Sequence, residues 1–332
     1  MKRARVAVCV ASYRRPQGLR RLLSGLDKLT FVKCPPPTIE VVVVDNDPAG
    51  LACEVCEEVS SKLRWPLECY IEPRRGISHA RNSAIARVKE GTDFVAFIDD
   101  DEVPETSWLD ELLYVQQSYG ADVVSGPVLP RFIGDVPDWI LKGKFFETER
   151  YPTGHLLNLS RTGNALVRSE LFSKLGEPFD VRYAMTGGED TLFFRRLHRA
   201  GYKMVWADDA LVYDWVPEGR ANARWILKRA YRAGNVFILV ELNFRPLAKV
   251  GIVRAATASI RIVQGLLLAT FSLALGRHVF VKGLQYMARG VGMFAGLAGM
   301  RYEQYRRSLT VELTSRAGSS ENLMNRDQAR AE

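Results

Sequence analysis

Short apolar runs alternate with helical patterns throughout the first third of the chain, and this alternation constrains the fold more than any other feature. The run Ile39–Asp45 is mainly β-branched, which is typical of a strand buried on both faces. The other strands predicted in this part are Val6–Tyr13, Leu67–Ile71 and Phe94–Ile98, and the predicted helices are Pro16–Leu29, Ala52–Leu63, Ser78–Lys89 and Ser107–Ser118. This order predicts an α/β fold with a mostly parallel, Rossmann-like sheet flanked by helices. Active sites of such folds lie beyond the carboxyl ends of the strands.

The pattern continues less regularly to residue 216, where the first predicted domain (1–216) ends. Ile133–Leu159 has weak periodicity and contains Gly, Pro and aromatic residues, so we expect a long loop over the site. The remaining predicted elements are the strands Leu166–Arg168, Met204–Trp206 and Ala210–Tyr213 and the helix Glu189–Ala200.

The second half of the chain has a different composition. Residues 217–248 predict a basic helix, and residues 249–302 are apolar and rich in small side chains. The longest uncharged run there, Ile262–Gly276, has 15 residues, fewer than the roughly 20 that span a bilayer. We therefore expect helices that lie in the membrane interface or form a re-entrant hairpin, with a soluble helical bundle as the alternative. The polar tail, residues 303–332, is expected to be disordered.

The net charge of +8 indicates an anionic partner, either a membrane surface or a nucleic acid. The basic residues of the second half border apolar helices, which favours a membrane surface, and we expect no nucleic-acid partner. All five cysteines lie in the first 70 residues, and Cys53 and Cys56 form a single C-x-x-C without the second pair of ligands that a closed zinc site requires. The odd count indicates a reducing compartment.

The cluster Asp99–Glu102 directly follows an apolar strand. Four adjacent carboxylates are costly unless a cation or ligand compensates their charge. Mg²⁺ and Mn²⁺ prefer oxygen ligands and bridge phosphate oxygens through one or two protein carboxylates. Asp99 and Asp101, a D-x-D pair, therefore predict a Mg²⁺ or Mn²⁺ site, with a solvated acidic turn as the alternative.

Two further segments place acids where a ligand is expected. Val44–Asp47 is a second strand end with carboxylates, which can hold a nucleobase or ribose or can simply form a turn. In Thr186–Asp190, two glycines allow close approach of the backbone to a ligand, and Glu189 and Asp190 then begin a helix. A carboxylate at that position is a candidate general base for a hydroxyl nucleophile.

These segments, with Ala11–Pro16 and Gly76–Asn82, occur in the order and spacing of the family 2 glycosyltransferases. The chain resembles in particular the branch of bacterial exopolysaccharide glucosyltransferases, over about residues 5–240. The resemblance implies a GT-A fold for the catalytic domain, an inverting mechanism and a UDP-sugar donor.

By the same resemblance, the donor site contains Tyr13 and Asp45 at the nucleobase, Arg75 or Arg81 beside it, and Asp99 at the ribose or, through water, at the metal. Asp101 would bind the metal directly, and the metal would stabilise the departing diphosphate. Asp190 is the expected base, with Glu189 as the next candidate.

Two departures from the family pattern refine this prediction. A Q-x-x-R-W motif typical of processive members is incomplete, because Ala221 stands before Arg224-Trp225, and this favours transfer of a single sugar. Asp214 stands where members often supply a metal-binding histidine, and we expect it to bind the metal in place of that histidine. We expect Arg220 and Arg224 to bind diphosphate, since arginine suits bidentate phosphate contacts.

The sequence thus predicts a hexosyltransferase that moves one hexose, with glucose as the first candidate, from a UDP-sugar to a polyprenyl-diphosphate-linked saccharide. The place of reaction would be the cytoplasmic face of the inner membrane, in exopolysaccharide or surface polysaccharide biosynthesis. The alternatives are a sugar-nucleotide nucleotidyltransferase and a non-catalytic nucleotide-sugar-binding relative.

Overall fold

The computed structural model describes residues 3–174 and 176–305. Its strands are β1 Arg5–Ser12, β2 Thr38–Asp45, β3 Leu67–Ile71, β4 Phe94–Ile98, β5 Glu102–Pro104, β6 Val123–Ser125, β7 Val128–Phe132, β8 Asn164–Arg168, β9 Met204–Trp206 and β10 Val212–Val216. Its α-helices are α1 Pro16–Asp27, α2 Leu51–Ser60, α3 Ile77–Ala86, α4 Trp108–Tyr119, α5 Asp138–Gly143, α6 Glu170–Lys174, α7 Glu189–Arg199, α8 Ala223–Glu241, α9 Leu247–Leu275 and α10 Arg277–Leu297. Two 3₁₀ turns, η1 Val181–Tyr183 and η2 Glu218–Arg220, complete the list.

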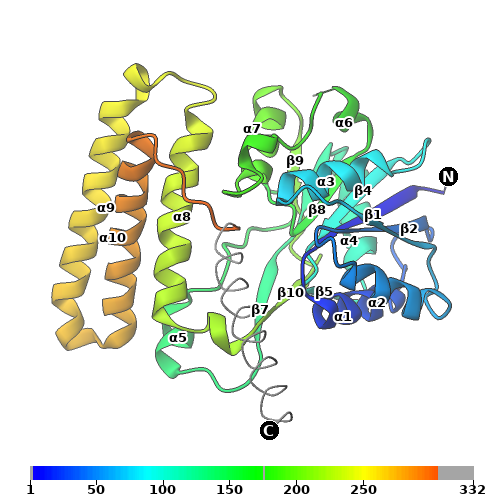
Figure 1. Cartoon of the computed structure of the whole chain (residues 1–332), viewed down its shortest axis with the longest axis horizontal. Coiled ribbons are helices and arrows are strands. Elements are labelled where there is room, and N and C mark those ends of the chain that lie inside the picture. Colours follow the sequence, from blue (N-terminus) through cyan, green and yellow to red (C-terminus); the bar gives the residue numbers. More distant parts are fainter. Residues whose placement is uncertain (1–2, 175, 306–332) are drawn as a thin grey trace, which may run out of the picture.

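A seven-stranded sheet in the order β3-β2-β1-β4-β8-β6-β9 forms the centre of the first domain. All neighbours pair in parallel except β8, which runs antiparallel to β4 and β6. One hydrophobic core forms between the sheet and α1, α2 and α4, and a second core lies on the other face, against α3 and α7 (Figure 1). The predicted mostly parallel sheet flanked by helices is confirmed.

A second, three-stranded sheet in the order β5-β10-β7 was not predicted from the sequence. Its first strand has only three residues, too few to produce a periodic pattern. The antiparallel pairing of β10 with β5 places Asp214 opposite Glu102, directly beside the acidic cluster.

The last three long helices stand side by side at one edge of the molecule (Figure 1). α9 has 29 residues, and its most apolar 18-residue window has a mean hydropathy of 1.6 and is 11% buried. By length and composition alone, it is the one helix in the described part of the chain that is apolar enough to cross a membrane.

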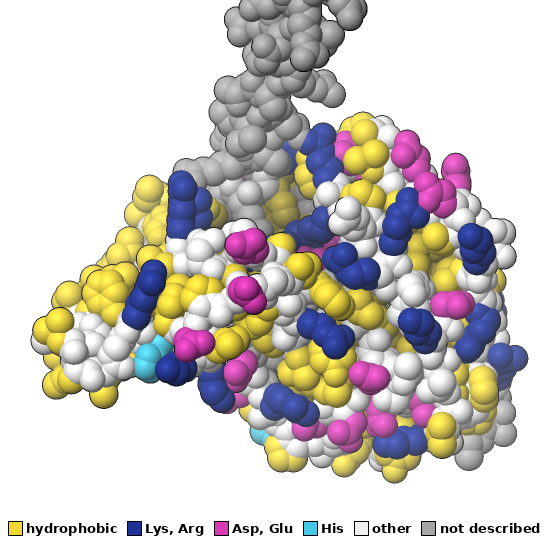
Figure 2. All heavy atoms as spheres, turned by 90° about the horizontal axis from the view of Figure 1, so that it is seen from below, with side chains coloured by type: hydrophobic (Ala, Val, Ile, Leu, Met, Phe, Trp, Pro, Cys, Tyr) yellow, Lys and Arg dark blue, Asp and Glu magenta, His cyan; other side chains and the backbone are white. Residues whose placement is uncertain are grey.

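The uncharged run of 15 residues is shorter than the apolar helix that contains all of it but Gly276. The helix continues through Arg254, which pairs with Glu241 of α8 at 2.7 Å, and through Arg261, which lies over the Tyr286 ring of α10. These charges face neighbouring helices, so the outer side of α9 remains apolar. Figure 2 shows hydrophobic side chains concentrated at this end of the molecule.

α9 and α10 approach each other closely because glycines lie at their contact. A Cβ atom built on Gly265 would lie 2.5 Å from the Gly283 carbonyl oxygen, so no side chain fits there. The close packing makes the two helices a single hairpin.

The prediction of a reducing compartment from the cysteines is not supported by the structure. Cys53 of α2 and Cys69 of β3 form a disulfide, with a Cα–Cα distance of 5.3 Å. The pair was missed because its partners meet only when α2 packs on β3. Disulfides are typical of oxidising compartments, so the cysteines give no support to a reducing one.

Candidate active site

The acidic cluster after β4 is held in place by the loop between β1 and α1. Asp100, which is 3% exposed, accepts hydrogen bonds from the Ser12 hydroxyl at 2.9 Å, the Tyr13 backbone N–H at 3.2 Å and Arg15 Nη1 at 2.7 Å. Burial raises the pKa of the Asp100 carboxyl to about 6, although Arg15 acts to lower it. The middle acid of the cluster therefore fixes the turn, and its neighbours Asp99 and Asp101 line a cavity of about 420 Å³.

Asp101 and Asp214 lie side by side in this cavity. Asp101 Oδ2 lies 3.0 Å from Arg15 Nη1 and 2.8 Å from Arg220 Nη1. Asp214 Oδ1 is buried and has no hydrogen-bond partner among the described residues. Burial, together with the negative charge of Asp101, raises the pKa of Asp214 to about 6. Among the described residues, the nearest cation to this oxygen, Arg220 Nη1, is 3.9 Å away, so a buried oxygen without a hydrogen bond, beside a second carboxylate, fits a divalent cation.

The described part of the chain contains no group of three or more His, Cys, Asp or Glu side chains arranged to hold a metal by themselves. Mg²⁺ and Mn²⁺ do not require one, since they bind through one or two carboxylates plus phosphate oxygens and water. The donor set of Asp101 and Asp214, with Asp99 nearby in the same cavity, is thus suited to a metal that arrives with a diphosphate.

Arg81 connects the acidic cluster to α7. Its Nη2 donates to Asp99 Oδ1 at 2.9 Å, and its Nη1 donates to Glu189 Oε1. Glu189 is 2% exposed, and its Oε2 has no hydrogen-bond partner in the described structure. Burial raises the pKa of Glu189 to about 7, against the lowering effect of Arg81. Glu189 and Arg81 therefore form a buried pair, in which Arg81 lines the cavity and Glu189 does not.

Asp190 has a different environment from its neighbour. Gly187 and Gly188, with φ of 72° and 94°, turn the chain into α7 in a conformation that glycine adopts readily. Asp190 then lines the cavity, and its Oδ1 accepts from the Thr191 backbone N–H at 2.6 Å. The two candidate bases are thus separated by position, since Asp190 faces the cavity and Glu189 is buried.

The residues predicted to contact the nucleobase, Tyr13, Asp45 and Arg75, differ in how accessible they are to a ligand. The Tyr13 ring lies 5.1 Å from the Arg75 guanidinium, so these two residues are neighbours, and their contact with a nucleobase stays a prediction. Asp45 is at the end of β2, but it is 0% exposed and both its oxygens accept backbone N–H groups, from Asp47 and Ala52. In this geometry Asp45 shapes the loop before α2, and a direct contact with a base would require one of these bonds to break.

Of the two arginines expected at the diphosphate, Arg220 lines the cavity, whereas Arg224 is exposed and is not among its lining residues. Sequence reasoning missed several other lining residues, namely Arg15, Arg232, Tyr302 and Tyr305. The two tyrosines belong to the segment after α10, which returns to the site along α8. Its path is fixed by the Asn235 amide, which donates to the Met300 carbonyl at 2.8 Å and accepts from the Tyr302 N–H at 3.1 Å.

This return corrects part of the prediction for the tail. The Tyr305 backbone N–H donates to the Met185 carbonyl at 3.2 Å, so residues 303–305 are ordered against the site. Burial raises the pKa of the Tyr305 phenol to about 12. The remainder of the expected disordered tail, residues 306–332, lies outside the described residues. No periodic signal in the sequence marks this contact.

Two family models match the chain. The model described as glycosyl transferase family 2 matches residues 7–176, and the model described as glycosyl transferase family group 2 matches residues 94–301. Together they cover the large sheet, the acidic cluster and the three long helices.

The chain is also similar to individual proteins. It is 33% identical to the succinoglycan biosynthesis protein ExoM of Rhizobium meliloti, over 69% of this chain and 72% of the relative. Among solved structures, it resembles mannosyltransferase PcManGT of Pyrobaculum calidifontis in complex with GDP-Man and Mn²⁺ (TM-score 0.62, 18% identity, 90% of this chain and 88% of that one). It also resembles S. aureus TarS 1-349 in complex with UDP-GlcNAc (TM-score 0.50, 17% identity, 90% and 93%). At these identities the two structures support the fold, which is GT-A.

Proposed function

Because the chain belongs to glycosyl transferase family 2, we propose that it transfers a hexose, with inversion, from a UDP-sugar to a polyprenyl-diphosphate-linked saccharide. The observation that carries this proposal is the placement of Asp101 and Asp214 on one side of a cavity that Asp190 also lines. Asp101 and Asp214 suit a metal bound to the leaving diphosphate, and Asp190 suits activation of an acceptor hydroxyl. The family match supports a glycosyltransferase, and no observation favours the alternative of a sugar-nucleotide nucleotidyltransferase.

Asp101 and Asp214 would hold Mg²⁺ or Mn²⁺, with Asp99 at the ribose or at a metal-bound water. The metal, when bound, supplies positive charge that stabilises the departing diphosphate. Arg15 and Arg220 both contact Asp101. Both guanidinium groups can turn to the phosphate oxygens when Asp101 binds the metal, which keeps the site close to charge balance.

Asp190 is the proposed general base. It faces the cavity and has one oxygen, Oδ1, oriented by Thr191, which leaves the carboxylate placed to accept the proton of an acceptor hydroxyl. Glu189 is less suited, because its side chain is buried and paired with Arg81. Its role would be to fix Arg81 and, through it, Asp99.

The relative ExoM is named for succinoglycan biosynthesis, and this supports a place for the present chain in exopolysaccharide or surface polysaccharide biosynthesis. The long apolar face of α9 supports a membrane-bound acceptor. The cytoplasmic face of the inner membrane is the proposed location, because nucleotide sugars are the proposed donors. Arg75 and Tyr13 would contact the nucleobase. Arg224 does not line the cavity, so its position does not support a role in donor binding.

The test is calorimetric binding of UDP-glucose, UDP-GlcNAc and GDP-mannose to the full chain, with and without Mn²⁺. We expect one UDP-sugar to bind only in the presence of metal and Asp101→Ala to abolish that binding. Glu90→Ala, which removes an exposed carboxylate outside the cavity, is the matched control. Metal-independent binding that survives Asp101→Ala would overturn the proposal.

A further inference from the structure

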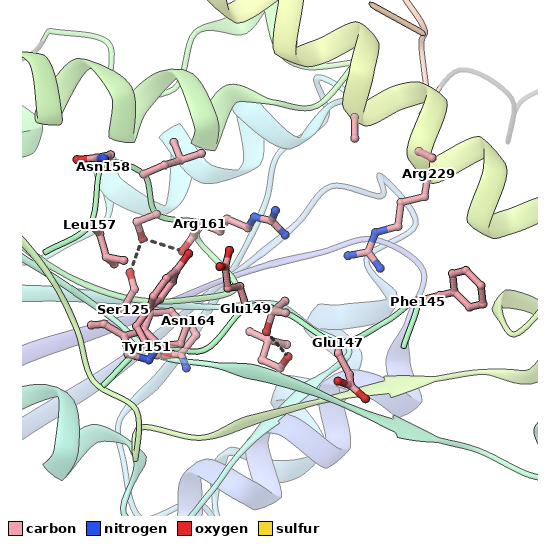
Figure 3. A pocket seen from close by; sticks show the side chains of 18 of the residues that line it. Ser125, Phe145, Glu147, Glu149, Tyr151, Leu157, Asn158, Arg161, Asn164 and Arg229 are labelled. Atoms are coloured by element: carbon pink, nitrogen blue, oxygen red, sulfur yellow. Dashed lines mark hydrogen bonds between the residues drawn. The ribbon is translucent and has the colours of Figure 1, made fainter. Parts of the chain in front are cut away.

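A second, larger cavity of about 680 Å³ lies next to the candidate active site. Its walls are the segment from Phe145 to Arg161 on one side and α8, α9 and α10 on the other. Figure 3 shows the guanidinium groups of Arg161 and Arg229 turned toward the same space, with Glu147 and Glu149 in the wall below them. The cavity therefore lies between the catalytic domain and the apolar helices.

Its lining is strongly basic. Five cationic side chains reach it from four different parts of the chain, namely Arg161, Arg229, Arg261, Lys282 and Arg289, against the two carboxylates of Glu147 and Glu149. Among the described residues, no ion pair joins any of the five to a carboxylate. Burial, with the charges of Arg161 and Arg232, lowers the pKa of Arg229 to about 10. Uncompensated cations in a partly desolvated space favour an anionic ligand.

Aromatic rings hold several of these cations in position. Arg229 lies 5.2 Å from the Trp225 ring centroid, Arg261 lies 5.2 Å from that of Tyr286, and Lys282 lies 5.3 Å from that of Phe145. Such contacts orient a cation without neutralising its charge. The positive charges are therefore arranged before any ligand binds.

The basic cavity adjoins the active-site cavity, and one of its walls, α9, is apolar on its outer face. Val128, Thr148, Arg161 and Arg229 line both cavities. Arg261 belongs to α9, whose outer face exposes Leu266, Leu267 and other large apolar side chains. A ligand with a charged centre, a sugar end and an apolar tail would match this sequence of surfaces.

We propose that the basic cavity binds the diphosphate of the lipid-linked acceptor, with the saccharide directed past Arg161 and Arg229 to Asp190 and the lipid chain along α9. The inference rests on the proposed function and specifies where its acceptor is held. The donor's diphosphate would lie in the other cavity, beside Asp101, where Arg15 and Arg220 are found, whereas Arg261, Lys282 and Arg289 line only the basic cavity. The distance from the bound diphosphate to Asp190 would then select acceptors whose saccharide is long enough to reach that residue.

The test measures binding of geranylgeranyl diphosphate to the full chain in detergent, by calorimetry, for wild type and for Lys282→Gln/Arg289→Gln. Neither residue lines the donor cavity. We expect the double variant to weaken binding at least tenfold, while UDP-sugar binding in the presence of Mn²⁺ changes less than twofold. Arg245→Gln, an exposed arginine outside both cavities, should bind both ligands like wild type, and Arg289→Lys should retain binding because it keeps the charge.

Two further probes separate the possible sources of the anion. Inorganic pyrophosphate should bind much more weakly than geranylgeranyl diphosphate, and equal affinity would overturn the assignment to a lipid diphosphate. Phosphatidylglycerol vesicles should bind the double variant as they bind wild type, and lost vesicle binding with intact diphosphate binding would assign the cations to the membrane surface instead. If the wild type bound no UDP-sugar, the proposed function would be contradicted. If the double variant bound geranylgeranyl diphosphate as tightly as the wild type, only this inference would be contradicted.

Discussion

Arg220 Nη1 lies 2.8 Å from Asp101 Oδ2, so an arginine from the turn before α8 contacts the very carboxylate that the sequence assigns to the metal. The pair joins the catalytic domain to the start of the helical extension. A guanidinium and a divalent cation compete for the same oxygen, and a diphosphate can satisfy both of them at once.

Arg220→Gln should therefore affect two ligands in opposite directions. We expect Mn²⁺ alone to bind several-fold more tightly, because a competing cation is removed. The UDP-sugar should bind about 10- to 150-fold more weakly, since a charge-assisted contact with phosphate contributes roughly 1.5–3 kcal/mol. Calorimetry with metal alone and with metal plus donor measures both effects. Arg224→Gln serves as the control, because that residue is exposed and outside the cavity. Equal loss of donor affinity in both variants would show that Arg224 reaches the phosphates.

The adjacent acids Glu189 and Asp190 should give different phenotypes. Asp190→Asn is expected to keep metal-dependent donor binding and lower the transfer rate by about 10²–10⁴-fold, the usual contribution of a general base. Glu189→Ala leaves the buried Arg81 with Asp99 as its remaining carboxylate partner, so the loss of stability should stay below the roughly 3–5 kcal/mol of a fully unpaired buried charge. Single-turnover transfer and urea unfolding separate the two effects. Near-normal turnover of Asp190→Asn would remove it as the base.

Metal affinity should fall as the pH falls through about 6. The pKa of Asp214 is raised to about 6, so this carboxylate is ionised at pH 7.5 and largely protonated at pH 5, and a metal binds the ionised form. Calorimetric titration with Mn²⁺ at both pH values measures the change, and Asp214→Asn should bind weakly at both with a smaller difference between them. If the variant kept the wild-type pH dependence, Asp214 would not be a ligand.

The same shift has a consequence for folding. Because the pKa of Asp214 is higher in the folded chain than its ordinary value, the native state holds more protons between about pH 4 and pH 6. The contribution of Asp214 to the free energy of unfolding of the metal-free protein should therefore decrease as the pH rises across this window. Urea unfolding in EDTA should show a weaker pH dependence for Asp214→Asn than for wild type, and identical slopes would rule the contribution out.

The outer face of α9 should control membrane binding. Leu267→Glu with Leu273→Glu introduces two charges at side chains that are 55% and 95% exposed, and we expect sedimentation with phosphatidylglycerol vesicles to fall at least fivefold. Val32→Glu, at a side chain that is 90% exposed on the catalytic domain, is the matched control. Vesicle binding that resists the α9 substitutions would place the membrane contact elsewhere on the molecule.

Much of the fold could be predicted because its strands are buried on both faces. The run of valines in β2 and the apolar strand β4 each stand out as continuous blocks, and their ends place Asp45 and Asp99 at one edge of the sheet. The small sheet could not be predicted in the same way, since β5 has three residues and pairs with a strand more than a hundred residues away.

The candidate site was predictable where acids follow strands, as at Asp99 and Asp101. It was not predictable where neighbours decide the role of a residue. Glu189 and Asp190 are adjacent acids that the resemblance alone ranks, and the physical difference between them, the burial of Glu189 against Arg81, is visible only in the structure. Likewise, Arg220 and Arg224 both follow β10, and the end of η2 turns only the first toward Asp101.

The return of the chain from α10 to the catalytic cavity matters for how the enzyme is prepared. Tyr302 and Tyr305 form part of the cavity wall, although they follow the apolar hairpin in the sequence. A shortened protein that ends before α9, made to improve solubility, would therefore lack part of the wall of the candidate active-site cavity. Kinetic constants from such a fragment would describe a cavity without these two tyrosines, whereas the full chain in detergent or bilayer retains them.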